Sequence, residues 1–220
     1  MKTSFHGIIF DLDGTLVDSE RVWHMAETRV IESRGYKYTL EDRALVLGLR
    51  IDEAMVAVRD HYGMTDDIPA LVDELNYAMV NLVAEHVIAQ PGAHALIDYV
   101  IRRDIPHAIA SASPYIVIDA IVEHMGWLPY FPVRCSADDE AHGKPAPDVY
   151  LTAARKLGIA PNKCLAIEDT PAGAQAAVSA GMTCYVVPDH VYSKPHMFDG
   201  ITPHVFSGLP EILRTLDEWL

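Results

Sequence analysis

Apolar and polar positions divide the chain into two kinds of region. A short apolar run at residues 7–10 predicts a first strand, and from residue 91 onward apolar runs alternate with segments of helical period. Strands are predicted at 106–110, 133–135, 163–167, 183–187 and, at an edge, 203–206; helices are predicted at 93–103, 115–125, 148–157, 172–180 and 210–219. Repeated strand–helix units of this length predict an α/β fold with a parallel sheet covered by helices.

The region between the first strand and Pro91 has a different pattern, with no strong strand run. Its apolar residues recur at helical spacing, which predicts helices near 20–33, 40–47, 51–62 and 68–88. We therefore predict a core domain of residues 1–17 and 89–220, with an α-helical cap domain of residues 18–88 inserted after the first strand.

Two acids, Asp11 and Asp13, follow the first strand directly. Side chains two residues apart on extended backbone point the same way, so both can address one site. Carboxylates held that close raise each other's pKa unless a cation lies between them. Mg²⁺ with oxygen ligands is the usual cation where phosphate is also bound. Taken alone, however, a single Asp-x-Asp pair after a strand is more typical of a loop cap or a solvated turn.

Three further motifs place polar residues after apolar runs or in a stiff loop. They are Ser111-Ala112-Ser113, Gly143-Lys144-Pro145 and Glu168-Asp169. Two of the three have an ordinary structural interpretation: Ser111 as a helix N-cap, and the adjacent acids as charges at a helix N-terminus. Ser113-Pro114 could cap the following helix instead, which would leave the Ser111 hydroxyl for a ligand.

Together with Asp11 and Asp13, these motifs resemble in order and spacing the four motifs of the haloacid dehalogenase (HAD) superfamily. The resemblance implies a Rossmann-like core in which Asp11 is a nucleophile that forms an aspartyl-phosphate and Asp13 is the general acid and base. It implies that Ser111, Ala112 and Lys144 bind the phosphate. It also implies that Mg²⁺ is bound by Asp11, the backbone carbonyl of Asp13, Asp169 and, either directly or through water, Glu168.

The helical insertion resembles the cap of the subgroup that contains β-phosphoglucomutase and the sugar phosphatases. In the mutase a cap histidine stands at the position of Trp23, with His24 here one residue beyond, so the residue at this position favours a phosphatase. We expect Trp23 and Arg50 to face the substrate, although helix packing and a surface salt bridge are their ordinary alternatives. A dehalogenase needs neither Asp13 nor a metal, and the cap's only lysine, Lys37, matches no Schiff-base motif.

The amino-acid composition argues against two classes of binding partner. The 220 residues carry 31 acids against 17 lysines and arginines, a formal charge of −14, which argues against nucleic acid and anionic membranes as partners. Three cysteines, Cys135, Cys164 and Cys184, lie in or beside apolar runs and are expected to be reduced. We expect no signal peptide, no membrane span, a cytoplasmic monomer and a small phosphorylated metabolite as partner.

The sequence thus predicts a Mg²⁺-dependent phosphomonoesterase of small phosphorylated sugars or sugar alcohols, such as 2-deoxyglucose 6-phosphate or hexitol phosphates. A phosphosugar mutase of the β-phosphoglucomutase kind is the alternative. A non-catalytic module that binds phosphosugars is a third hypothesis, against which the complete set of motif residues argues.

Overall fold

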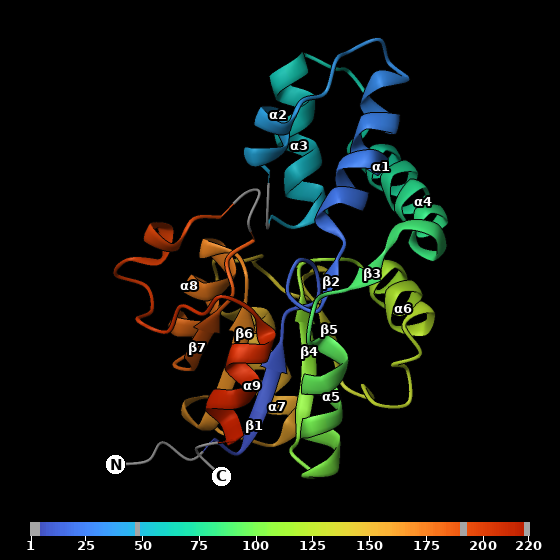
Figure 1. Ribbon diagram of the computed structural model, residues 1–220. Helices are drawn as coiled ribbons and strands as arrows, with labels where there is room; N and C mark the ends of the chain where they lie inside the picture. The colour runs from blue at the N-terminus through green and yellow to red at the C-terminus, as the bar shows by residue number, and fades with distance from the viewer. Residues whose placement is uncertain (1–4, 47–48, 190–192, 218–220) are drawn as a thin grey trace.

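The computed structural model describes residues 5–46, 49–189 and 193–217. Its centre is a five-stranded parallel sheet in the order β5-β4-β1-β6-β7 (Figure 1). The strands are β1 (Gly7–Phe10), β4 (His107–Ser111), β5 (Arg134–Ser136), β6 (Cys164–Glu168) and β7 (Thr183–Val186). This parallel arrangement confirms the predicted α/β fold class.

Helices cover both faces of the sheet, so its central strand is buried on both sides. All four residues of β1 are buried; Ile8 and Phe10 contribute to one apolar cluster and Ile9 to another, as alternation along a strand requires. The first face is covered by α5 (Ala93–Arg102), α6 (Tyr115–His124) and α9 (Leu209–Asp217), and the second by α7 (Asp148–Leu157) and α8 (Pro171–Ser179).

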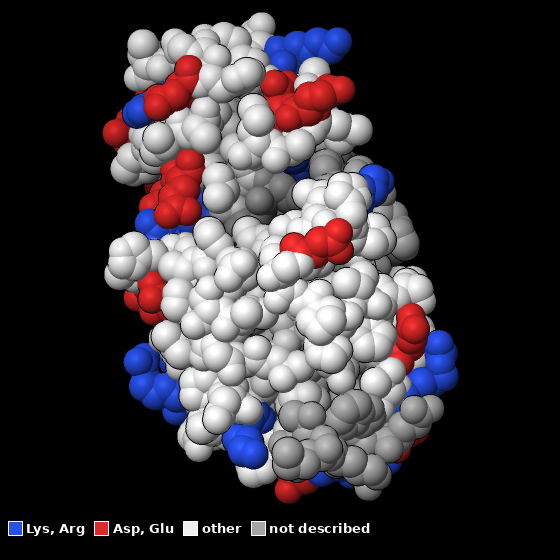
Figure 2. Space-filling view, turned by 90° about the vertical axis from the view of Figure 1, so that its left-hand side faces the viewer, with Lys and Arg blue, Asp and Glu red and all other residues white. Residues whose placement is uncertain are grey.

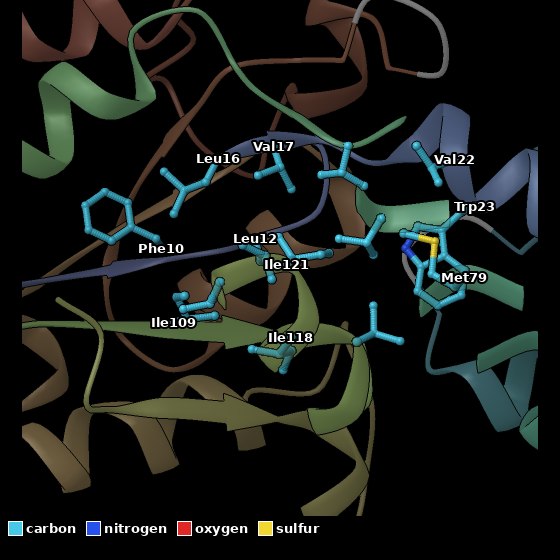
Figure 3. Packing of buried hydrophobic residues seen from close by; sticks show 14 of the residues in the cluster. Phe10, Leu12, Leu16, Val17, Val22, Trp23, Met79, Ile109, Ile118 and Ile121 are labelled. Atoms are coloured by element: carbon cyan, nitrogen blue, oxygen red, sulfur yellow. The ribbon is translucent and has the colours of Figure 1, made fainter. Parts of the chain in front are cut away.

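The helical insertion lies beyond the C-terminal ends of the strands (Figure 1). It comprises α1 (Glu20–Glu32), α2 (Leu40–Ala44), α3 (Ile51–Tyr62) and α4 (Ile68–His86). Its apolar interior is continuous with the first cluster of the core, which runs from Phe10 and Ile109 in the sheet to Trp23 and Met79 in the insertion (Figure 3).

Two short strands that the sequence did not predict connect the insertion to the core. β2 (Val17–Asp18) pairs antiparallel with β3 (Ile88–Ala89), so the chain enters and leaves the insertion side by side. The predicted helix 68–88 consequently ends at His86, because Val87 is already extended. The domain bounds of 18–88 stay a prediction.

Other sequence predictions differ from the structure in detail. The helix predicted at 40–47 ends at Ala44, and position 47 lies outside the described residues. The edge strand predicted at 203–206 is reduced to one bridge between Val186 and Val205. The closing helix is described to Asp217, so its predicted end near Trp219 lies outside the described residues. None of the described helices is long and apolar enough to span a membrane.

Candidate active site

The polar motifs converge because the strands that carry them are neighbours. β4, β1 and β6 lie side by side and parallel, so their C-terminal ends bring Ser111, Asp11 and Glu168 to one edge of the sheet. Lys144 reaches the same edge from the loop before α7. Open α/β sheets bind their ligands at this edge.

Lys144 is a buried cation between two buried acids. Its Nζ donates at 2.6 Å to Oδ1 of Asp11 and at 2.6 Å to Oε1 of Glu168, and the lysine is only 3% exposed. Burial raises the pKa of Asp11, and the ammonium of Lys144 opposes that rise. Burial works against the charge of Lys144 itself, but the two carboxylates raise its pKa overall. A cation is therefore held beside the proposed nucleophile.

Both carboxylate oxygens of Glu168 accept hydrogen bonds from groups of the protein. Besides Lys144, its Oε1 accepts a hydrogen bond from the Tyr150 hydroxyl at 2.8 Å, while Oε2 accepts from the backbone N–H groups of Asp169 and Thr170 at 3.0 and 3.2 Å. Direct metal binding would compete with these bonds. The arrangement suits Glu168 to orient the site and to contact a metal through water.

The acids at this edge have the chemistry of a divalent-cation site. One carboxylate oxygen from each of Asp11, Glu168 and Asp169 lies within 4.8 Å of the others. Oδ2 of Asp11 and Oδ2 of Asp169 are buried without a hydrogen-bond partner, and burial together with the neighbouring Asp11 raises the pKa of Asp169. A hard cation would satisfy these orphaned oxygens, so the residues fit the group that the motifs imply.

The backbone at Gly14 leaves room for this cluster. Gly14 has a φ of +80°, and a Cβ there would lie 2.1 Å from Oδ2 of Asp169. The Thr15 hydroxyl, one residue on, donates to Oδ1 of Asp169 at 3.1 Å. Glycine is therefore required for both the left-handed turn and the close approach of Asp169.

Asp13 is oriented by four donors from two parts of the molecule. Ser19 Oγ and Trp23 Nε1, from the start of the insertion, donate to Oδ1 at 2.7 and 2.9 Å. Ser111 Oγ and Ser113 Oγ, from the end of β4, donate to Oδ2 at 3.1 and 2.7 Å. The carboxylate is thus fixed beside Asp11 by both the insertion and the core.

Two serines that precede helices donate to Asp13 instead of capping, which for Ser113 corrects the predicted capping role. Ser19 occupies the N-cap position of α1 but makes no side-chain capping bond, because its hydroxyl addresses Asp13. Ser113 does not cap α6, whose N-cap residue is Pro114, since its hydroxyl also donates to Asp13. In this structure Ser111 is not left free, because its Oγ both donates to Asp13 and accepts from the Ser113 N–H.

A cavity lies between these residues and the helical insertion. Its core side includes Asp11, Asp13, Ala112 and Lys144. Figure 2 shows the hollow between the insertion and the core, with acidic side chains on both sides of it. The side chains of the insertion that line the cavity are Glu20, Trp23, Glu27, Arg43, Val46, Leu49, Ile51 and Ala54.

Three charged residues on the insertion side were not predicted. Arg43 forms buried ion pairs with both Glu20 and Glu27, and the Tyr38 hydroxyl donates to Glu27 at 2.9 Å. Burial raises the pKa of Glu20 to about 7 against the opposing effect of Arg43. The sequence signal was weak: Glu20 and Glu27 are seven residues apart, on the same helical face as buried apolar residues.

Of the two insertion residues expected at the substrate, only Trp23 lines the cavity. Arg50 forms an ion pair with Asp52, with Nε–Oδ1 and Nη2–Oδ2 distances of 2.6 and 2.8 Å. It also donates to the backbone carbonyl of Glu140 at 3.0 Å, across the boundary between insertion and core. Residues 47 and 48, shortly before Arg50, lie outside the described residues.

Residues 8–187 match the family model of the haloacid dehalogenase-like hydrolases, which thus spans the sheet, the insertion and all four motifs. The chain belongs to this family.

Several relatives of this HAD-like hydrolase are named as phosphatases. The fructose-1-phosphate phosphatase YqaB of Escherichia coli K12 is 31% identical over 185 residues, 83% of this chain and 96% of that protein. Hexitol phosphatase A of the same strain is 34% identical over 188 residues, 82% and 81% of the two chains. The chain is accordingly an enzyme of the phosphatase class within its family.

A solved structure gives the same result for the fold. A mutant of CbbY from Rhodobacter sphaeroides, in complex with xylulose-(1,5)bisphosphate, superimposes with a TM-score of 0.85 at 26% identity, over 94% of this hydrolase and 96% of that chain. Members of the family generally use a divalent metal, in agreement with the buried acidic cluster of this hydrolase.

Proposed function

We propose that this hydrolase is a Mg²⁺-dependent phosphomonoesterase that acts on small phosphorylated sugars or sugar alcohols. One observation carries the proposal: Asp11, buried and paired with Lys144, shares a cavity with Asp13, whose carboxylate is fixed by four donors. A nucleophile, a cation and an acid–base group are thus within reach of one phosphate ester. The names of the fructose-1-phosphate and hexitol phosphatases support a sugar or sugar alcohol as the alcohol part.

The reaction proceeds in two steps at this site. A carboxylate oxygen of Asp11 attacks phosphorus and forms an aspartyl-phosphate, while the departing alkoxide takes a proton from Asp13. Asp13 then removes a proton from a water molecule, which cleaves the aspartyl-phosphate and releases inorganic phosphate. Asp11 is regenerated, and Asp13 holds a proton for the next cycle.

Charge on the phosphoryl oxygens is balanced by groups that are already in place. The ammonium of Lys144 and the backbone N–H of Ala112 are the proposed donors to these oxygens. The hydroxyl of Ser111 is a third proposed donor, which must first leave Asp13, to which it donates at 3.1 Å. Asp11, the backbone carbonyl of Asp13, Asp169 and, through water, Glu168 would hold the Mg²⁺. When bound, the cation supplies positive charge that offsets the repulsion between a carboxylate nucleophile and a phosphate.

The insertion contributes residues to the alcohol side of the substrate. Trp23 lines the cavity and contacts Asp13, so we propose that it faces the substrate and positions the acid–base group. Arg50, engaged with Asp52 and Glu140, would reach a substrate only by leaving these partners. Its contacts favour a role in holding the insertion against the core.

The mutase alternative receives less support. A mutase must keep the aspartyl-phosphate from water while the sugar reorients. The indole N–H of Trp23 donates to Asp13 but, unlike a histidine at this position, it cannot accept a proton. No contact among the described residues favours retention of the phosphoryl group over its hydrolysis.

The test is phosphate release from a panel of hexose and hexitol phosphates, with Mg²⁺ or with chelator, and with sugar analysis of hexose 1-phosphate reactions. Asp11→Asn should lower turnover by about a thousandfold or more, because no other group can replace the nucleophile. Asp73→Asn, an exposed change on α4, is the matched control. Wild-type turnover by Asp11→Asn on every ester, or isomerised sugar phosphate without free phosphate, would contradict the proposal.

A further inference from the structure

A group of buried charges faces the catalytic residues from across the cavity. We call Glu20, Glu27 and Arg43 the insertion charge cluster; they are 7%, 4% and 3% exposed. Arg43 pairs with both glutamates, through Nη2 to Glu20 and Nη1 to Glu27. The proposed mechanism uses none of the three side chains.

The position of the cluster relates it to the part of the substrate that does not react. The phosphate that reacts must lie at Asp11 and Lys144, on the core side of the cavity. The cluster and its apolar neighbours Val46 and Ile51 line the opposite side. The remainder of a small substrate, which extends away from the reacting phosphate, therefore meets the insertion charge cluster.

The charge balance of the cavity leaves little positive charge for a second anion. Among the described residues that line it, the cations are Lys144 and Arg43. Lys144 is paired with Asp11 and Glu168, and Arg43 is paired with two glutamates. With both glutamates ionised the insertion charge cluster carries a net charge of −1, and with one protonated it carries zero.

We propose that the insertion charge cluster makes this hydrolase selective for monophosphates whose remaining part is uncharged and rich in hydroxyl groups, and that it excludes bisphosphates. This rests on the proposed function and specifies its substrate class. Each ionised carboxylate has several lone pairs, so Glu20 and Glu27 can accept hydrogen bonds from sugar hydroxyls while they stay paired with Arg43. A second phosphate would bring a dianion into a buried site beside two carboxylates. The guanidinium at this side of the cavity, that of Arg43, is already paired with both carboxylates.

The fold itself does not impose this exclusion. The mutant CbbY structure, which superimposes over 94% of this chain, holds a bisphosphate. Selectivity against a second phosphate must therefore come from side chains, and the insertion charge cluster is the charged group placed to provide it.

A purely structural role for the cluster makes a different prediction. If the ion pairs only join α1 to α2, their loss would lower the stability of the protein and reduce its activity on all substrates alike. If they select the substrate, their loss would change the ratio of kcat/KM values for bisphosphate and monophosphate. The ratio separates the two roles because a general loss of folded enzyme cancels in it.

The experiment compares kcat/KM for sorbitol 6-phosphate and fructose 1,6-bisphosphate in the wild type, Glu20→Gln and Glu27→Gln. We expect the wild type to prefer the monophosphate by about a hundredfold or more, which tests the proposal without any variant. Glu27→Gln keeps the shape but removes one negative charge, so it should raise the bisphosphate-to-monophosphate ratio at least about tenfold, or about 1.4 kcal/mol. Glu20→Gln should act in the same direction.

Two controls isolate the charge. Glu32→Gln removes an exposed carboxylate from the same helix, and Tyr38→Phe removes an uncharged donor to Glu27. Both variants should leave the ratio of kcat/KM values unchanged. A wild type that hydrolyses both substrates equally well, or a Glu27→Gln variant that loses both activities in proportion, would overturn the inference. A wild type without phosphate release from any monophosphate would instead refute the proposed function.

Discussion

Replacing Lys144 by methionine would test how the catalytic edge is held together without its metal. Methionine keeps most of the apolar stem but removes the ammonium that donates to Asp11 and Glu168. Both acids are buried, at 5% and 0% exposure, so water cannot replace the lost donor. The variant therefore has two buried carboxylates that face each other without their cation.

The expected cost follows from the burial of the pair. Removal of one partner of a buried ion pair typically costs about 3–5 kcal/mol. Protonation of one carboxylate relieves part of this, so we expect the free energy of unfolding to fall by about 3 kcal/mol at pH 8 in chelator. Turnover should fall at least about a hundredfold, because the cation beside the phosphoryl oxygens is lost.

The pH dependence has a definite sign. Burial raises the pKa of Asp11 and Lys144 opposes the rise, so the pKa climbs further in Lys144→Met. An acid whose pKa is higher in the folded than in the unfolded protein contributes stability below the unfolded pKa, and this contribution is lost as the pH rises. The stability deficit of the variant should therefore be larger at pH 8 than at pH 5.

Urea unfolding with EDTA at pH 5 and pH 8 measures both effects. Lys163→Met, which removes an exposed lysine, is the control and should change the free energy of unfolding by less than about 0.5 kcal/mol. The reasoning is wrong if Lys144→Met is as stable as the wild type at pH 8, or if its deficit grows toward pH 5.

Three further predictions concern neighbouring contacts. Trp23→Phe keeps a smaller aromatic ring but removes the 2.9 Å hydrogen bond to Asp13, so kcat should fall about 3- to 10-fold; an unchanged kcat would show that this donor is dispensable. Gly173→Ala places a Cβ 1.8 Å from Oε1 of Glu168, so activity should be lost although alanine favours the helix, and retained activity would mean that Glu168 can move away freely. Mg²⁺ at a hundred times its Kd should stabilise the wild type by about 2.7 kcal/mol in thermal unfolding, and Asp169→Asn should lose most of this gain; equal gains in both would place the ion elsewhere.

Much of the α/β core could be predicted from the sequence because its signals are local. The run Gly7–Phe10 is apolar throughout because β1 is covered on both faces. The acids after it and after β6 stand at strand ends, and parallel strands in adjacent positions carry such residues to one edge. The HAD resemblance added Lys144, whose approach to Asp11 spans 133 residues and has no local signal.

Other features depended on contacts between distant segments. Ser19 and Ser113 precede helices and have the composition of caps, yet their hydroxyls donate to Asp13 because the insertion and β4 meet there. The strand expected at 203–206 remained a single bridge at Val205, which no local pattern distinguishes from a strand.

The sequence alone therefore determined the order of the main helices and strands, the parallel sheet and the residues at its catalytic edge, because periodicity and strand ends are properties of neighbouring positions. Only the tertiary structure decided the partners of each polar group. Glu20, Glu27 and Arg43 have the composition of a solvated surface, and their burial is possible only because folding brings the three charges together. Compensation of a buried charge depends on distance in space, which the separation of residues along the chain does not contain.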